Sequence, residues 1–253
     1  MSEEQRTRRG VETSIRTALV WEAVSEAARE RRSGGPLRVL DLGGGSGGFA
    51  VPLAEDGHDV VVVDPSPDAL ASLDRRAGEA GVADRVHGFQ GDATTLSDAV
   101  SEEVDLVCCH GVLEYVDDAA ATLAAVREVL APSGILSLLV AQRLAAVLSR
   151  ALAGQFQAAR TALLSTDGRW GAADPMPRRF DADTIHDLLA GAGLRTTSIQ
   201  GVRVFGDLVP SAFLDTDADR ADLLALERAL GEHGSGDLLG RLGAGLHVLA
   251  VRD

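Results

Sequence analysis

The segment RVLDLGGGSGG at residues 38–48 constrains the fold of this chain more than any other. Its first residues, Arg38–Leu42, form a short apolar run that is typical of a strand, and a glycine-rich loop follows before a predicted helix over 47–54. Glycines in such a loop let a ligand approach the backbone because no Cβ is in the way, and the helix N-terminus adds free N–H donors. The segment therefore predicts a nucleotide-like cofactor bound at the end of a strand.

Strand and helix patterns alternate through the first part of the chain. The valine run at Asp59–Asp64 is typical of a parallel strand that is buried on both faces. Repeated strand–helix units predict a doubly wound α/β fold. The expected strands are 38–42, 59–64, 85–90, 104–109 and 135–141, and the expected helices are 11–32, 47–54, 67–80 and 118–130.

The second part of the chain departs from this alternation. One helix is expected over 143–165 and a loop over 166–180, followed by a helix at 181–192, a strand at 194–204, a helix at 217–230 and a last strand at 246–252. Two final strands joined by a helix suit an antiparallel edge. We therefore predict a single domain over 1–253, a Rossmann-like α/β fold with a seven-stranded, mostly parallel sheet, helices on both faces and an antiparallel last strand.

Asp41 helps to identify the cofactor. The glycine spacing alone also fits the G-x-G-x-x-G fingerprint of dinucleotide sites. A carboxylate at position 41, two residues before the first glycine, would face the cationic amino end of S-adenosyl-L-methionine, whereas it would repel a pyrophosphate. We therefore expect S-adenosylmethionine and not a nicotinamide or flavin cofactor.

Two further acids end predicted strands. Asp64 is placed to accept hydrogen bonds from both ribose hydroxyls, or alternatively it caps the helix that begins at Pro67. Asp92 follows the third strand, where it lies near the adenine amine or forms the N-cap of a helix starting near Ala93. The two interpretations of Asp92 are compatible with each other.

His110 ends the fourth strand, at the sheet edge where ligands bind in such folds. It is expected to contact the cofactor, with a general base or a helix cap as alternatives. Glu114 and Tyr115 follow closely and either line the acceptor pocket or pack the loop.

With these residues in place, the chain resembles the class I methyltransferase family of the tRNA 5-carboxymethoxyuridine carboxyl methyltransferase. The glycine loop and strands at 38–141 are generic to class I enzymes. The narrower similarity lies in residues 15–21 (IRTALVW), 110–115 (HGVLEY), 153–156 (AGQF) and 201–205 (GVRVF).

The resemblance implies roles for individual residues. Arg16 matches an arginine that reaches the cofactor, which makes residues 1–36 a helical cover over the cofactor. By the same resemblance His110 contacts the cofactor and Asp64 binds the ribose. The remaining cofactor-binding set is Gly43, Gly44 and Gly45 in the loop, with Ala93 and Thr94 after Asp92 on the adenine side.

The acceptor is expected near the helical insertion at 143–180. If the acceptor is a carboxylate, it is already ionised at pH 7 and needs no base, so a cation would orient it. Arg203 is the candidate, with a surface arginine as the alternative. If the acceptor is a hydroxyl or an amine, His110 or Glu114 is the candidate base.

The net charge of the chain does not identify the methyl acceptor. The chain has a net charge of −14, which disfavours nonspecific phosphate binding, and the lysine-rich insertion of the RNA-modifying relative is absent. A tRNA, a small metabolite and cofactor binding without catalysis are therefore all carried as hypotheses. The sequence contains no run of about 20 uncharged apolar residues and no signal peptide or metal-ligand cluster is visible, so we expect a cytoplasmic protein without a membrane partner or a metal; the oligomeric state is not predicted.

Overall fold

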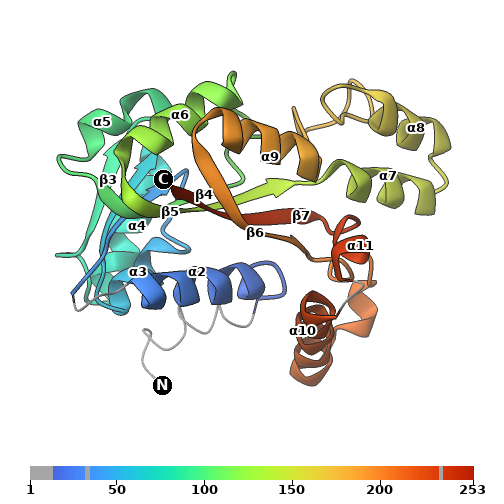
Figure 1. Ribbon diagram of the computed structural model, residues 1–253. Helices are drawn as coiled ribbons and strands as arrows, with labels where there is room; N and C mark the ends of the chain where they lie inside the picture. Colours follow the sequence, from blue (N-terminus) through green and yellow to red (C-terminus); the bar gives the residue numbers. More distant parts are fainter. Residues whose placement is uncertain (1–13, 32–34, 234–235) are drawn as a thin grey trace.

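Seven strands form one sheet, in the order β3-β2-β1-β4-β5-β7-β6, in the computed structural model, which describes residues 14–31, 35–233 and 236–253 (Figure 1). The first five strands pair in parallel, whereas β7 is antiparallel to both of its neighbours. The predicted mostly parallel sheet with an antiparallel last strand is confirmed. The strands are β1 (Arg38–Leu42), β2 (Asp59–Asp64), β3 (Val86–Gln90), β4 (Val104–His110), β5 (Leu130–Ala141), β6 (Leu194–Val202) and β7 (Gly245–Arg252).

Helices cover both faces of this sheet (Figure 1). On one face α2 (Ala18–Arg31), α3 (Ala50–Glu55) and α4 (Pro67–Glu79) pack their apolar side chains against β1 and β2, with Trp21 and Leu73 in that core. The opposite core is formed with η1 (Ala93–Thr95), α5 (Leu96–Ala99), α6 (Ala119–Val129) and α9 (Ala182–Gly191). Successive strand residues point to opposite faces, which is why the near-continuous apolar strands supply both cores.

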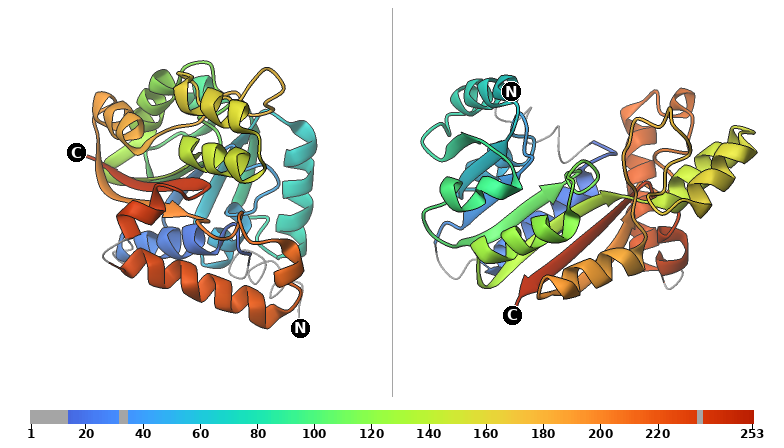
Figure 2. Two further views of the ribbon diagram at one scale, coloured as in Figure 1. Left: turned by 90° about the vertical axis from the view of Figure 1, so that its right-hand side faces the viewer. Right: turned by 90° about the horizontal axis from the view of Figure 1, so that it is seen from above.

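The predicted helix over 143–165 is wrong. The chain forms two helices there, α7 (Arg143–Leu152) and α8 (Phe156–Leu164), because it turns between them at Gly154, which has a φ of +73°. A left-handed residue of this kind ends an α-helix, and glycine adopts it without a Cβ penalty. The two helices extend beyond the sheet as an arm (Figure 2).

Other boundaries differ from the expectation by a few residues. β5 begins five residues before the predicted position because Leu130 pairs with Val104 across a register irregularity. β6 ends at Val202 because the next residue, Arg203, has a φ of +59° and leaves the extended region. Of the predicted helix at 11–32, the described part begins at Ala18, and positions 11–13 and 32 lie outside the described residues.

The described part of the segment between β6 and β7 contains three helices. They are η2 (Ser211–Phe213), α10 (Asp217–Glu232) and α11 (Gly236–Gly240). Arg228 of α10 forms an ion pair with Glu22 of α2, so these distant segments lie side by side (Figure 2). Ile15, before α2, packs against Gly206 in the turn that follows β6.

Candidate active site

The glycine loop folds tightly over the end of β1. At Gly43, which has a φ of +71°, a Cβ would overlap the Val112 side chain, and at Gly44 a Cβ would overlap the Asp41 carboxylate. A Cβ at Gly45 would come no closer than 3.9 Å to another atom, the Asp64 carboxylate. Packing within the protein therefore requires glycine at 43 and 44, in addition to any ligand that approaches the loop.

Asp41 lies beneath this loop as a buried carboxylate. Its Oδ2 atom has no hydrogen-bond partner among the described residues. Burial and the nearby Asp64 carboxylate raise the pKa of Asp41 to about 7, although the backbone N–H of Ala50 lowers it. An unpartnered carboxylate of this kind is stabilised by a proton or by a cationic ligand.

Asp64 ties the glycine loop to the start of α4. Its carboxylate accepts hydrogen bonds from the backbone N–H groups of Gly45 (3.0 Å) and Ser66 (2.9 Å). The N-cap of α4 is Ser66, whose hydroxyl accepts from the N–H of Ala69, so the alternative in which Asp64 caps this helix is wrong. Each Asp64 oxygen keeps further acceptor capacity toward a ligand.

Asp92 caps the short helix η1. It accepts hydrogen bonds from the N–H and the hydroxyl of Thr94, at 2.8 and 2.6 Å, and these bonds lower its pKa. Ala93 is buried beside it. The N-cap interpretation is therefore confirmed, and the role of these three residues on the adenine side stays a prediction.

His110 belongs to a hydrogen-bonded row across three strands. Its Nε2 atom lies 2.9 Å from the Ser137 hydroxyl, which lies 2.8 Å from Nε2 of His247. The ring also packs edge-on against Phe49, at 4.6 Å between centroids, and its Nδ1 atom is buried without a partner among the described residues.

Both imidazoles of this row are neutral at physiological pH. Burial, with a smaller effect of His247, lowers the pKa of His110 to about 3, and burial lowers that of His247 to about 4. A base with such a low pKa abstracts protons poorly at pH 7. The row therefore favours His110 as a hydrogen-bonding group over His110 as a general base.

Glu114 is also buried, and its carboxylate is hydrogen-bonded to the last residue of β5. Its Oε1 atom accepts a hydrogen bond of 2.6 Å from the backbone N–H of Ala141, whereas Oε2 has no partner among the described residues. Burial raises its pKa, against opposing backbone hydrogen bonds and the charge of Arg179. Tyr115, by contrast, is 62% exposed.

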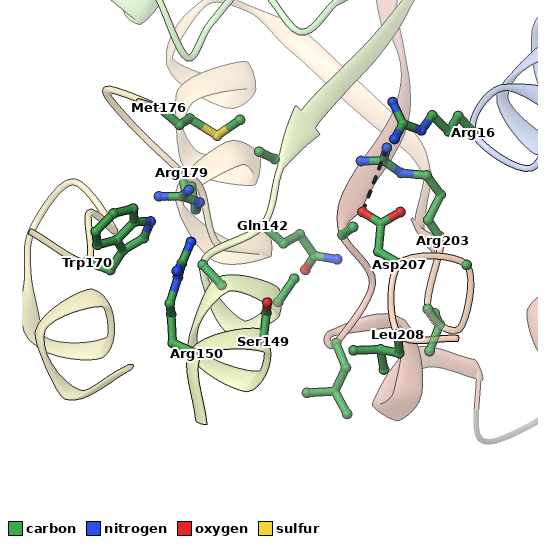
Figure 3. Close-up of a pocket in the computed structure, with 17 residues that line it drawn as sticks. Arg16, Gln142, Ser149, Arg150, Trp170, Met176, Arg179, Arg203, Asp207 and Leu208 are labelled. Atoms are coloured by element: carbon green, nitrogen blue, oxygen red, sulfur yellow. Dashed lines mark ion pairs between the residues drawn. The ribbon is translucent and has the colours of Figure 1, made fainter. Parts of the chain in front are cut away.

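A pocket of about 500 Å³ opens beyond the end of β5 (Figure 3). It lies between α7, the loop at 165–180 and the turn after β6. The charged side chains that line it are four arginines and one aspartate: Arg16, Arg150, Arg179, Arg203 and Asp207. A pocket with this surplus of guanidinium groups is suited to an anionic ligand.

Arg16 and Arg203 form one side of this pocket (Figure 3). Arg16 is brought there because Ile15 packs so closely against Gly206 that a Cβ at 206 would overlap it. Asp207 lies 4.0 Å from Arg203, whose Nε atom is buried without a partner among the described residues. The sequence-based candidates Arg16 and Arg203 thus meet, whereas His110 and Glu114 do not line the pocket.

A side chain of α10 holds the turn that begins at Arg203. The buried carboxylate of Glu227 accepts hydrogen bonds from the backbone N–H groups of Val204, Phe205 and Gly206, at 2.8–3.1 Å. These bonds hold the three residues that follow Arg203, which itself has a φ of +59°. A non-glycine residue with positive φ is uncommon, and such strain is typical of functional positions.

The other side of the pocket comes from residues that sequence reasoning missed. Arg150 and Trp170 belong to the helical insertion, and Arg179 ends its loop. Gln142 at the centre donates its side-chain N–H to carbonyl groups of residues 240, 243 and 245, which joins the end of β5 to the segment before β7. The signal in the sequence was the high number of arginines at 143–180, but this number does not reveal which of them face the pocket.

The carboxyl edge of the sheet fits the expected cofactor. The unpartnered Asp41 oxygen suits a cationic group, and the free acceptor capacity of Asp64 suits ribose hydroxyls. The described residues include no group of three or more His, Cys, Asp or Glu side chains that could hold a metal ion. Within the same residues, none of the helices has the length and hydropathy of a membrane span.

Known proteins with similar sequences include methyltransferases. Residues 39–134 match the family model of a methyltransferase domain. The chain is 32% identical over 215 residues to the tRNA 5-carboxymethoxyuridine methyltransferase of Escherichia coli (strain K12), covering 84% of this chain and 80% of that protein. It is 41% identical over 109 residues to a ubiquinone biosynthesis O-methyltransferase of Azorhizobium caulinodans, covering 43% of this chain and 42% of the relative.

Solved structures with the same fold give a consistent result. The magnesium protoporphyrin IX methyltransferase of Synechocystis, solved with bound SAH, superposes with a TM-score of 0.61 at 17% identity, over 100% of this chain and 89% of that one. A methyltransferase from Mesorhizobium loti gives 0.62 at 21% identity, over 94% and 100%. The chain therefore belongs to the class I S-adenosylmethionine-dependent methyltransferases.

Proposed function

We propose that this enzyme methylates a carboxylate, that of 5-carboxymethoxyuridine in tRNA. The observation that carries the proposal is the pocket beyond β5, which is lined by four arginines. Asp174 and Asp207 pair with Arg179 and Arg203, so the arginines remain in surplus. The whole chain has a net charge of −14, so this concentration of positive charge is local. An anionic acceptor would complement it.

Methyl transfer to a carboxylate requires little acid–base catalysis from the protein. S-adenosylmethionine supplies an electrophilic methyl group, and a carboxylate acceptor is already ionised at pH 7. Arg203 holds and orients the carboxylate, and Arg16, for which the resemblance implies a cofactor contact, lines the same pocket. The lowered pKa of His110 agrees with a reaction that needs no general base.

Charge distribution supports an RNA acceptor. Residues 143–180 contain six arginines and two aspartates, a net +4, so the rest of the chain carries −18. The similarity to the tRNA-modifying relative also extends over 84% of this chain. A tRNA acceptor goes with the cytoplasmic location expected from the sequence, and both remain predictions.

The alternative acceptor is a small molecule with a hydroxyl group. The match to the ubiquinone biosynthesis O-methyltransferase favours it, but that match covers only 43% of this chain. Transfer to a hydroxyl would need a base, and the low pKa of His110 makes that residue a poor one.

The test is methyl transfer to tRNA that contains 5-carboxymethoxyuridine. The purified enzyme and labelled S-adenosylmethionine should add one methyl group to this nucleoside, seen by mass spectrometry. Mild alkali should remove the label, because it hydrolyses a methyl ester but leaves an ether or an N-methyl group intact. No transfer to this tRNA, or an alkali-stable label, would contradict the proposal.

A further inference from the structure

Arg150 and Trp170 form a stack on the wall of the acceptor pocket. The guanidinium carbon of Arg150 lies 4.2 Å from the centroid of the Trp170 ring, and both residues line the pocket (Figure 3). Arg150 also donates a hydrogen bond of 2.9 Å to the side chain of Gln155. The indole and this hydrogen bond together fix the orientation of the guanidinium.

The loop that carries Trp170 is itself held in place. The Asp174 carboxylate, whose side chain is fully buried, accepts hydrogen bonds from the backbone N–H of Trp170 and from two nitrogens of Arg179, at 2.6–3.1 Å. Arg179 also donates to the carbonyl of Gly168. The indole is therefore positioned before any ligand binds, which lowers the entropy cost of using it for recognition.

This geometry is suited to a flat ligand. An arginine guanidinium is planar and weakly hydrated, and proteins use such planes and aromatic rings as surfaces on which bases stack. The stack lies on one side of Gln142, and Arg16 and Arg203 lie on the other (Figure 3). An aliphatic acceptor would find anion-binding groups here but would have no use for a preformed planar surface.

We propose that the Arg150–Trp170 stack is the subsite for a planar ring of the acceptor, a nucleobase whose carboxylate reaches Arg203. The proposal rests on the proposed function for the position of the carboxylate. It adds the position of the ring and assigns a specificity role to two residues of the helical insertion.

The first experiment uses an RNA stem–loop that contains one 5-carboxymethoxyuridine. Arg150→Lys keeps the charge but removes the plane, so KM for this RNA should rise about tenfold, as for the loss of one base stack, with little change in kcat. Arg160→Lys is the matched control, because it also keeps the charge, and Arg160 is exposed on α8 and does not line the pocket. An unchanged KM in Arg150→Lys, or an equal rise in Arg160→Lys, would overturn the subsite.

The second experiment reads ring binding without catalysis. The chain has two tryptophans, and Trp21 is only 3% exposed, so a stacking base should quench mainly Trp170. Titration of the stem–loop in the presence of S-adenosylhomocysteine should lower the emission of the wild type, and Trp170→Phe should abolish this change. Equal quenching in the wild type and in Trp170→Phe would overturn the assignment.

The two proposals fail in different ways. If the wild type methylates methoxyacetate as efficiently as the stem–loop, carboxyl methylation stands but the ring subsite is refuted. If the wild type methylates neither compound, the proposed function is refuted, and quenching that requires Trp170 would still support the ring subsite.

Discussion

The proposed active site has two halves that differ in charge and in construction. The half proposed to bind the cofactor, the cofactor half, contains three carboxylates, Asp41, Asp64 and Asp92, at or just beyond the ends of β1, β2 and β3. The half proposed to bind the acceptor, the acceptor half, is lined by four arginines and one aspartate. This difference suits a transfer from a cationic cofactor to an anionic acceptor, because each half complements its own ligand.

The halves also differ in how they are assembled. In the cofactor half, the acids follow directly from parallel strands whose carboxyl ends meet at one edge. In the acceptor half, Arg16 and Arg203 meet through the packing of Ile15 on Gly206, far apart in sequence. Variants in one half should therefore change the binding of one ligand and leave the other unaffected.

The largest expected effect is on the acceptor half. Arg203→Ala should lower kcat/KM for the acceptor by about 10- to 150-fold, the loss of a charge-assisted hydrogen bond of about 1.5–3 kcal/mol. The affinity for S-adenosylmethionine, measured by titration calorimetry, should not change. Arg195→Ala, which alters an exposed arginine on β6, the strand that precedes Arg203, is the control. An equal loss of cofactor affinity in Arg203→Ala would show that the two halves are not separate.

The converse variant acts on the cofactor half. Asp64→Ala removes the acceptor of two backbone N–H groups as well as the proposed ribose contacts, so cofactor binding should weaken by about 1–3 kcal/mol. Asp68→Ala, an exposed acid in the first turn of α4, should leave the affinity unchanged. If calorimetry gave the same affinity for Asp64→Ala and the wild type, the ribose role of Asp64 would be excluded.

Asp41 should make cofactor binding depend on pH. Its pKa of about 7 leaves it partly protonated in the free enzyme, and a cationic ligand binds better to the ionised form. The affinity for S-adenosylmethionine should therefore rise by up to about tenfold between pH 6 and 7.5. Asp41→Asn should bind weakly at both pH values, without this rise. A pH-independent affinity in the wild type would argue against a direct interaction with Asp41.

The remaining expected effect is on folding stability and concerns the row of His110, Ser137 and His247. The pKa values of folded His110 and His247, about 3 and 4, lie below the ordinary value of 6.5. The unfolded chain therefore binds more protons as the pH falls below about 6.5, and the free energy of unfolding decreases down to about pH 4. His247→Gln keeps hydrogen-bonding groups near Ser137 but cannot be protonated in this range.

In this variant, the loss of stability between pH 7 and 5 should shrink by about 1–2 kcal/mol. Urea unfolding at the two pH values measures it. The same pH dependence in His247→Gln and the wild type would mean that His247 is not held neutral by burial.

Local sequence patterns determined most of the sheet and the cofactor half. The valine run of β2 was located to the residue, because a strand buried on both faces needs continuous apolar side chains. The acids at positions 41, 64 and 92 could be identified because each adjoins such a strand or its following loop. The error over 143–165 arose because apolar periodicity does not show that Gly154 breaks the helix.

Only the tertiary structure decided how the acceptor half is built. The inward direction of Arg150 depends on Trp170, whose loop is held by the Asp174–Arg179 pair, and the turn after Arg203 depends on Glu227 of α10. These contacts join segments that no local pattern relates, and arginines on a surface and in a pocket look alike in sequence. The sequence by itself determined the strand ends and the glycine loop at which we predict the cofactor, because these follow from local patterns. The arginine-rich lining of the pocket beyond β5 emerged only from long-range packing.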